Sequence, residues 1–312
     1  MMIESIKQGF SITHKNWQVI LLRVAAGAIN VIGFFFLVGT PVIIAIISFG
    51  IDVAQVRDMF PGILENPMDI LTRYIGLAVL VAVAFLIYLT VASIIIIYAY
   101  GGTIGVLRNA VLDEQFKFSY SGFFREAGRF FFPLVWLSSL AMLLILAAVI
   151  AFAILAGVVF AVTQVSAGSG SSLIVFFSTF FSLLLVFLAL TLGLGSLIYI
   201  VYASIAMVAD GRGVMDSFRS AWVFVMGRPM AFVFYILLII GILAVNILLV
   251  MIGFAFQMTP IIGPFAGIPY KVAYCAVQVY LGVVMWGALV AYYMRGTKRS
   301  ASEVIQTPAR DI

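Results

Sequence analysis

The sequence predicts an all-α integral membrane protein with six transmembrane helices, arranged as three tandem hairpins. The first observation behind this prediction is composition. Of the 312 residues, 65% are hydrophobic and only 9% are charged, and the mean hydropathy is +1.24. A soluble domain of this length could not bury so much apolar surface, so lipid must be the solvent for most of the chain. The second observation is a recurring order of segments, in which a short amphipathic stretch precedes two long apolar runs.

All six apolar runs reach the length that a membrane-spanning helix requires. They lie at roughly 18–50, 72–100, 131–163, 173–207, 230–258 and 268–294, and about 20 residues are enough to cross a hydrocarbon core. A helix satisfies its own backbone hydrogen bonds, whereas an open strand would leave N–H and C=O groups unpaired in lipid. We therefore expect six helices, with a break at Gly39-Thr40-Pro41 in the first of them, because proline interrupts helical hydrogen bonding.

Three short segments resemble one another and begin the three hairpins: Ile3–Asn16, Phe116–Arg129 and Met215–Arg228. The predicted apolar stripes are Ile3, Ile6, Phe10 and Thr13 in the first segment, Phe116, Tyr120, Phe123, Phe124, Ala127 and Phe131 in the second, and Met215, Phe218, Ala221, Trp222 and Val225 in the third. Charged residues fall between these positions. Each segment is therefore expected to form an amphipathic helix at the cytoplasmic face of the membrane.

The spacing of these segments predicts a single membrane domain over residues 1–312. Its repeats are expected at about 1–112, 113–209 and 210–295, followed by a short cytoplasmic tail at 296–312. Because every hairpin begins on the same side of the membrane, the repeats are parallel in topology and related by an axis along the membrane normal. A pseudo-threefold bundle of six helices is the natural arrangement.

Lysine and arginine are distributed unequally between the two sides of the predicted spans. With the N-terminus in the cytoplasm, 14 of the 17 basic residues fall in inner segments, and three, Arg57, Arg73 and Lys271, fall outside. Cytoplasmic segments of membrane proteins carry the excess of Lys and Arg. We therefore expect a multi-pass protein of the bacterial cytoplasmic (inner) membrane, with both termini in the cytoplasm and residues 52–69 on the outer side.

A family resemblance lies in the passage between the fourth apolar run and the third amphipathic segment. It runs from Val201-Tyr202-Ala203 through Asp210-Gly211-Arg212-Gly213 to Ser220-Ala221-Trp222. A span here ends in a small polar turn, and an amphipathic helix with Ser and Trp leads into the next span. In this the chain resembles the membrane domain of some glycerophosphodiester phosphodiesterases and the YciC-like bacterial inner-membrane proteins. The resemblance implies the membrane domain alone, because one histidine and a tail of about 17 residues cannot supply the phosphodiesterase catalytic barrel and its metal ligands.

Charged residues at the predicted inner face are candidates for ligand contacts. Lys15, Arg129 and Arg228 each lie close before an apolar run, where anionic inner-leaflet lipids attract basic side chains. Asp210 and Arg212 follow the fourth run. Asp210 is expected to pair with Arg212 or to cap the next helix, and the alternative is a ligand contact.

Polar residues inside the apolar runs form a second set of candidates, because each needs a hydrogen-bond partner in lipid. Lys271, Tyr274 and Gln278 share one face of the last run, while Asn246 and Gln257 share a face of the fifth. These two faces could meet. They would then either fix helix packing through interhelical hydrogen bonds or line a polar vestibule open to the outer side.

The residue types that catalysis or coupled transport requires are missing from the six runs. None has Asp, Glu, Lys or His at its centre, which argues against proton-coupled transport. No Ser/Lys, paired-Asp or His-rich group suits a protease or a metal hydrolase. The single cysteine, Cys275, excludes a cysteine-based metal cluster. We therefore favour a protein that is not an enzyme and that uses no cofactor or metal ion.

Two interpretations of function stay open. The first is a polytopic inner-membrane protein that organises or assists other membrane components and associates with lipid. The second is a carrier, or a protein that handles lipids or small molecules in a cavity between the three repeats. The expected partners are membrane lipids, anionic ones in particular, and a membrane-protein partner. No nucleic acid is expected, because no basic stretch is interleaved with exposed aromatic residues.

Overall fold

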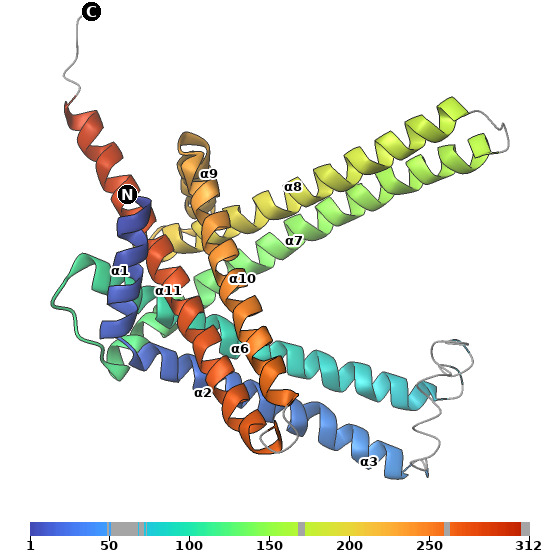
Figure 1. The fold of residues 1–312 in the computed structure, drawn as a ribbon, viewed down its shortest axis with the longest axis horizontal. Coiled ribbons are helices and arrows are strands. Elements are labelled where there is room, and N and C mark those ends of the chain that lie inside the picture. Colours follow the sequence, from blue (N-terminus) through green and yellow to red (C-terminus); the bar gives the residue numbers. More distant parts are fainter. Residues whose placement is uncertain are drawn as a thin grey trace, which may run out of the picture. The chain divides into compact units, whose positions relative to one another are not determined.

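The fold is described from a computed structural model, which covers residues 1–48, 50, 68, 72, 74–167, 172–258 and 263–306. The described elements are all helical (Figure 1). In chain order they are α1 (Met2–Lys15), α2 (Gln18–Phe34), η1 (Phe35–Gly39), α3 (Thr40–Ser48), α6 (Ile75–Leu112), α7 (Tyr120–Ala167), α8 (Ser172–Asp210), α9 (Val214–Gly227), α10 (Met230–Gln257) and α11 (Gly263–Gln306).

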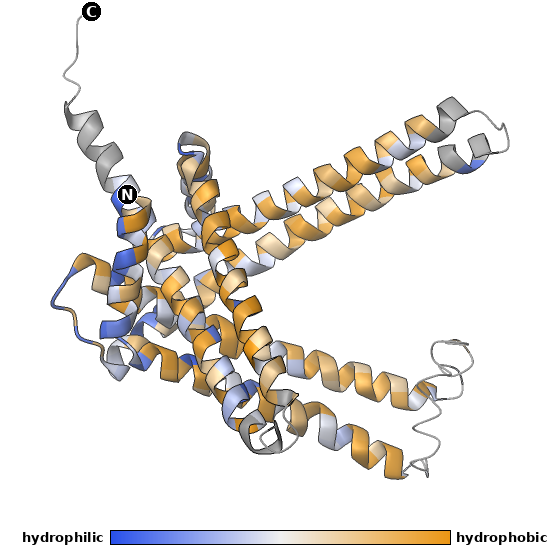
Figure 2. Cartoon of the chain, in the orientation of Figure 1, coloured by the Kyte–Doolittle hydropathy of each residue, from blue (hydrophilic) through white to orange (hydrophobic). Residues whose placement is uncertain are grey.

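The prediction of six long apolar helices is confirmed. The segments that are long and apolar enough to cross a membrane are Gln18–Ser48, Ile75–Leu112, Tyr120–Ala161, Phe176–Asp210, Met230–Phe256 and Gly267–Thr297. Figure 2 shows apolar residues along these helices and hydrophilic residues gathered at α1 and at the connection between α6 and α7. The predicted outer segment 52–69 lies outside the described residues, apart from Met68.

The chain divides into two compact units, one formed by Gln18–Tyr100 and the other by Met1–Trp17 with Gly101–Ile312. In the first unit, the expected break at Gly39-Thr40-Pro41 takes the form of a π-helical turn, η1, with which the helix continues as α3. The Thr40 hydroxyl donates to the carbonyl oxygen of Phe35 at 3.2 Å, across this turn. Phe34 packs edge-to-face on Tyr88 with ring centroids 5.2 Å apart, which pairs α2 with α6.

In the second unit, α7 and α8 form a long hairpin of 48 and 39 residues. At 1.5 Å per residue these helices extend about 72 Å and about 58 Å, well beyond a hydrocarbon core of about 30 Å. Large apolar side chains stay exposed along both, including Phe160 at 65% and Phe187 at 69%. Such surfaces suit a lipid environment, and both helices are long and apolar enough to cross a bilayer.

The last turns of α6 pack closely on the first turns of α7. A Cβ added at Gly102 would lie 2.7 Å from the ring of Phe123, and one at Gly105 would lie 2.7 Å from the Cβ of Glu126. The prediction of a separate amphipathic helix at Phe116–Arg129 is wrong, because residues from Tyr120 onward belong to α7 without a break. Pro133 does not end the helix. The missing N–H of proline leaves only one carbonyl unpaired in a helix of this length.

Helix α1 lies along α11 (Figure 1), and glycines form the centre of this contact. A Cβ at Gly9 would lie 2.7 Å from the backbone nitrogen of Ala288 and 2.9 Å from the carbonyl oxygen of Val284. Arg295 of α11 pairs with Glu4 at 3.0 Å. The buried face of α1 consists of Ser5, Gly9, Ile12 and Thr13.

The predicted apolar stripe of α1 shares only Thr13 with this buried face. Ile3 and Phe10 of that stripe are 70% and 43% exposed on the surface of the chain. In a membrane, small residues mediate close helix packing, while large apolar residues are equally well accommodated by lipid. The apolar stripe of α9 is divided between two surroundings, since Phe218 and Ala221 are buried but Met215 and Trp222 are exposed.

Candidate functional site

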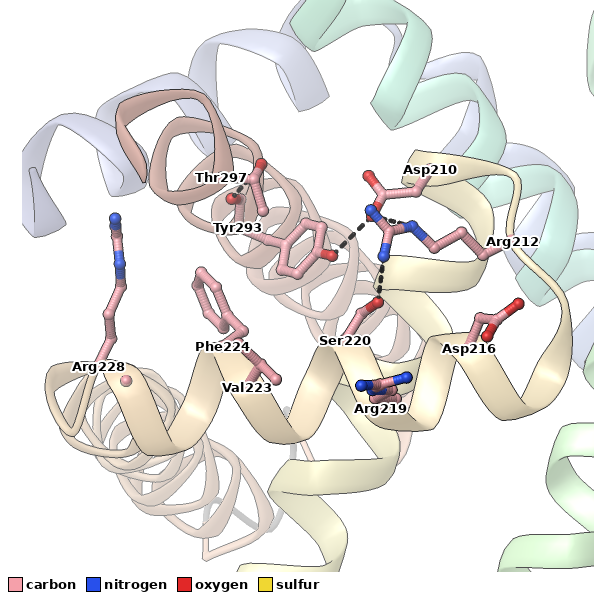
Figure 3. Close-up of a pocket in the computed structure, with 11 residues that line it drawn as sticks. Asp210, Arg212, Asp216, Arg219, Ser220, Val223, Phe224, Arg228, Tyr293 and Thr297 are labelled. Atoms are coloured by element: carbon pink, nitrogen blue, oxygen red, sulfur yellow. Dashed lines mark hydrogen bonds and ion pairs between the residues drawn. The ribbon is translucent and has the colours of Figure 1, made fainter. Parts of the chain in front are cut away.

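A cavity of about 810 Å³ lies where the end of α8, the length of α9 and the last turns of α11 come together (Figure 3). Its lining combines three arginines and two aspartates with hydroxyl and aromatic side chains. The lining residues are Asp210, Arg212, Asp216, Arg219, Ser220, Val223, Phe224, Gly227, Arg228, Tyr293 and Thr297. Because this lining gathers five charged side chains in one cavity, we treat it as the candidate site.

The sharp turn between α8 and α9 builds one end of this cavity. Gly211 has a φ of 66°, in the left-handed region that only glycine enters without a steric cost. The turn brings Arg212 back onto Asp210, with Nε 3.2 Å from Oδ2. Arg212 also donates from Nη1 to the Ser220 hydroxyl at 2.6 Å. The side chain of Arg212 thus ties the end of α8 to the middle of α9.

Tyr293 connects the same turn to α11. Its hydroxyl donates to Oδ2 of Asp210 at 3.0 Å, and its ring centroid lies 4.8 Å from that of Phe224. Tyr293 is only 1% exposed. One carboxylate, Asp210, therefore receives a guanidinium from the turn and a phenol from a helix 83 residues away in sequence.

Aromatic contacts hold α9 against its neighbours. Phe224 packs on Tyr202 of α8 with ring centroids 5.1 Å apart, and the Tyr202 hydroxyl donates to the carbonyl oxygen of Ala231 at 3.2 Å. The Tyr199 hydroxyl donates to the carbonyl oxygen of Phe218 at 2.8 Å. These contacts fix the position and rotation of α9, and with them the positions of its charged side chains.

Arg228 closes the other end of the cavity. It follows the last residue of α9 and lies over the Phe224 ring, with Cζ 5.9 Å from the ring centroid. A Cβ at Gly296 would lie 2.8 Å from Nη1 of Arg228, so the guanidinium rests on the bare backbone of α11. Three arginines and two aspartates give the lining a net charge of +1. Asp210 is already engaged by Arg212, and Asp216 lies in the first turn of α9, where a carboxylate suits the helix dipole.

The structure places the three predicted headgroup residues differently. Arg228 lines the cavity. Arg129 lies beside its turn, with Nη2 3.9 Å from the position of a Cβ at Gly211. Lys15 is exposed at the end of α1 and is not part of the lining. Asp210 and Arg212 form the ion pair that was one of the two structural expectations for them.

The predicted intramembrane faces of α10 and α11 meet at one hydrogen bond. The Tyr274 hydroxyl donates to Oδ1 of Asn246 at 3.2 Å. Lys271 and Tyr274 line a small cavity of about 220 Å³ with Gly253. Nε2 of Gln278 is buried and has no hydrogen-bond partner among the described residues, and the side chain of Gln257 lies outside what the structure describes.

Several residues of the site were not predicted from the sequence to be site residues. Ser220, Tyr293 and Thr297 line the cavity, yet their residue types are common on any helix. Tyr270 was missed as well. Its ring covers Gly253, and its hydroxyl donates to the carbonyl oxygen of Leu249. Tyr292-Tyr293 followed by Arg295 and Thr297 was the available signal, a polar cluster at the end of the last apolar run.

Within the part of the chain that the structure describes, no group of three or more His, Cys, Asp or Glu side chains could hold a metal ion. Comparison with models of protein families, with curated proteins and with solved structures finds no match to this chain.

Proposed function

We propose that this chain is a non-catalytic six-span protein of the bacterial cytoplasmic membrane that organises or assists other membrane components and associates with anionic lipid at its inner face. The observation that carries this proposal is the arginine-lined cavity between α8, α9 and α11. The excess of Lys and Arg assigns this end of the helices to the cytoplasm. Basic pockets between transmembrane helices on that side suit anionic headgroups.

A pseudo-threefold arrangement of three tandem repeats is part of the proposal. Helix α9 packs on α8 through Phe218 and Tyr199, and the start of α7 packs on the end of α6 through Phe123 and Gly102. Helix α1 packs on α11. Each amphipathic segment thus contacts the second span of the preceding repeat, and the first segment contacts the last span. This recurring order of contacts supports three related repeats. The sequence resemblance over residues 201–222 supports a proposed relation to the membrane domain of glycerophosphodiester phosphodiesterases and YciC-like proteins.

The proposed topology predicts a definite labelling pattern. Single cysteines at Glu65→Cys and Lys117→Cys, each in a Cys275→Ser background, are treated with a membrane-impermeant maleimide. In intact spheroplasts Glu65→Cys should react and Lys117→Cys should not, because the first lies outside and the second inside. Lys117→Cys should react after permeabilisation. Reaction of Lys117→Cys in intact spheroplasts would contradict the orientation.

The proposed lipid association predicts which lipids leave the membrane with the protein. Native mass spectrometry of the wild type, extracted in mild detergent, should find an anionic phospholipid retained in preference to zwitterionic ones. The double variant Arg129→Ala/Arg228→Ala should lose this retention at least about tenfold, because it removes one arginine beside the α8–α9 turn and one at the opposite end of the cavity, and with them their charge-assisted hydrogen bonds to a headgroup.

The matched control is Lys117→Ala/Arg125→Ala, which removes the same charge from exposed positions that do not line the cavity. If both double variants lost the same amount of retained anionic lipid, the association would depend on general surface charge and not on the cavity. A retained protein companion in constant stoichiometry, without lipid, would favour assistance to a protein partner. Recovery of neither lipid nor protein would overturn the proposal.

A further inference from the structure

The cavity between α8, α9 and α11 carries cationic groups at both of its ends. Figure 3 shows Arg228 at one end and Arg212 beside Asp210 at the other, with Phe224 and Tyr293 between them. Arg219, on the middle turns of α9, adds a third guanidinium. At 1.5 Å per residue, the positions of Arg219 and Arg228 are about 13 Å apart along the helix. Guanidinium groups therefore lie at two separated places in the cavity, Arg228 at one end and Arg212 with Arg219 toward the other.

Hydrogen-bond donors remain available at the Arg212 end. A guanidinium has five N–H groups, and the described contacts of Arg212 are Nε to Asp210 and Nη1 to Ser220. Because the Ser220 oxygen accepts from Arg212, its own O–H is left to donate to a ligand. The Thr297 hydroxyl differs, since it donates to the carbonyl oxygens of Tyr293 and Met294 at 3.1 Å. The anion-binding groups are thus Arg212, Arg219, Ser220 and Arg228.

The volume of the cavity indicates how large an anion would fill it. About 810 Å³ falls within the range of pockets that enclose a complete small molecule, and a single phosphate would leave most of it unfilled. The planar fork of a guanidinium matches the oxygens of phosphate. A cavity with guanidinium groups at both ends and an aromatic wall between them therefore fits two phosphates joined by a short spacer.

We propose that this cavity binds a ligand with two phosphate groups, held by Arg228 at one end and by Arg212, Arg219 and Ser220 at the other. The headgroup of a lipid that contains two phosphates and a soluble sugar bisphosphate share this chemistry. The proposal rests on the proposed function, because it specifies which anion is recognised at the inner face. It goes further in requiring discrimination between one phosphate and two.

The test measures binding to the full chain in detergent micelles. The probes are cardiolipin with two phosphates, phosphatidylglycerol with one, and fructose 1,6-bisphosphate as the soluble alternative. We expect one of the two-phosphate probes to bind at least about tenfold more tightly than phosphatidylglycerol, since a second charge-assisted hydrogen-bonded contact is of that size. Arg228→Gln should remove this preference. Arg219→Gln, at an exposed position, should weaken it without disturbing the fold.

The control is Arg125→Gln, which changes an exposed arginine that does not line the cavity and should leave all affinities unchanged. Tight binding of fructose 1,6-bisphosphate with the same dependence on Arg228 would support the site with a soluble ligand, and tight binding of cardiolipin would support it with a lipid. Equal affinity for one and two phosphates would overturn the inference while leaving the general lipid association intact. Equal weakening in Arg125→Gln and Arg228→Gln would overturn it too.

Discussion

Replacing Gly9 by valine is expected to detach α1 from α11. Even the first added carbon would lie 2.7 Å from the backbone nitrogen of Ala288 and 2.9 Å from the carbonyl oxygen of Val284. Backbone atoms in a packed helix cannot rotate away as a side-chain tip can, so the helices must separate. Overpacking typically costs up to about 3 kcal/mol, and a backbone clash belongs at the upper end of that range. The thermal midpoint in detergent should fall accordingly.

Gly27→Val is the matched control, because nothing lies within 4 Å of a Cβ at Gly27. It should leave the thermal midpoint unchanged. A bifunctional cross-linker between cysteines at Glu4→Cys and Arg295→Cys, in a Cys275→Ser background, reports the docking of α1 directly. These two side chains touch in the wild type, where they form an ion pair at 3.0 Å. Unimpaired cross-linking after Gly9→Val would contradict the packing of α1 through this glycine.

Replacing Tyr293 by alanine should release α9 from α11. The substitution removes a ring that is 1% exposed and packs at a tilt against Phe224, together with the hydroxyl that donates to Asp210. Truncating a buried aromatic side chain to alanine costs about 3–5 kcal/mol. The expected result is a large drop in the thermal midpoint and faster tryptic cleavage at Arg212 and Arg219, which lie in the released segment.

Tyr293→Phe separates the two contributions of this side chain. It keeps the ring against Phe224 and removes only the hydrogen bond to Asp210, at a cost of about 1–3 kcal/mol. The Asp210–Arg212 ion pair remains in this variant. If alanine and phenylalanine reduced the thermal midpoint equally, the ring would contribute nothing, and the described packing of α9 on α11 would be wrong.

The six long apolar helices could be predicted because they depend on two quantities that the sequence displays directly. These are the apolar content and the length of each run, set against the thickness of a bilayer. The form of each helix end could not be predicted in the same way. The segments Phe116–Arg129 and Met215–Arg228 have the same amphipathic pattern, yet Tyr120 begins a continuous 48-residue helix whereas Arg228 and Pro229 separate α9 from α10. The proline before α10 is the local difference between them.

The buried faces of the amphipathic segments were harder to predict for a physical reason. In water, large apolar side chains mark the buried face of a helix. In a membrane, lipid accommodates large apolar side chains equally well, so these side chains do not mark the buried face. Ile3 of α1 is exposed, while Ser5 and Gly9 are buried. The candidate site, too, could be predicted from the sequence only in part. Asp210 and Arg212 are two residues apart and could be paired from the sequence, but nothing local connects either of them to Tyr293.

The π turn at Phe35–Gly39 determines where the first span can tolerate a change in length. A turn closed by i→i+5 hydrogen bonds contains one more residue than an α-helical turn. In an ordinary helix an inserted residue would rotate everything after it by about 100°. The wider turn absorbs that rotation locally, so the faces of α2 and α3 keep their alignment. Homologues should therefore tolerate a deletion of one residue here, and only here within the described first span, without reorienting either half of the helix.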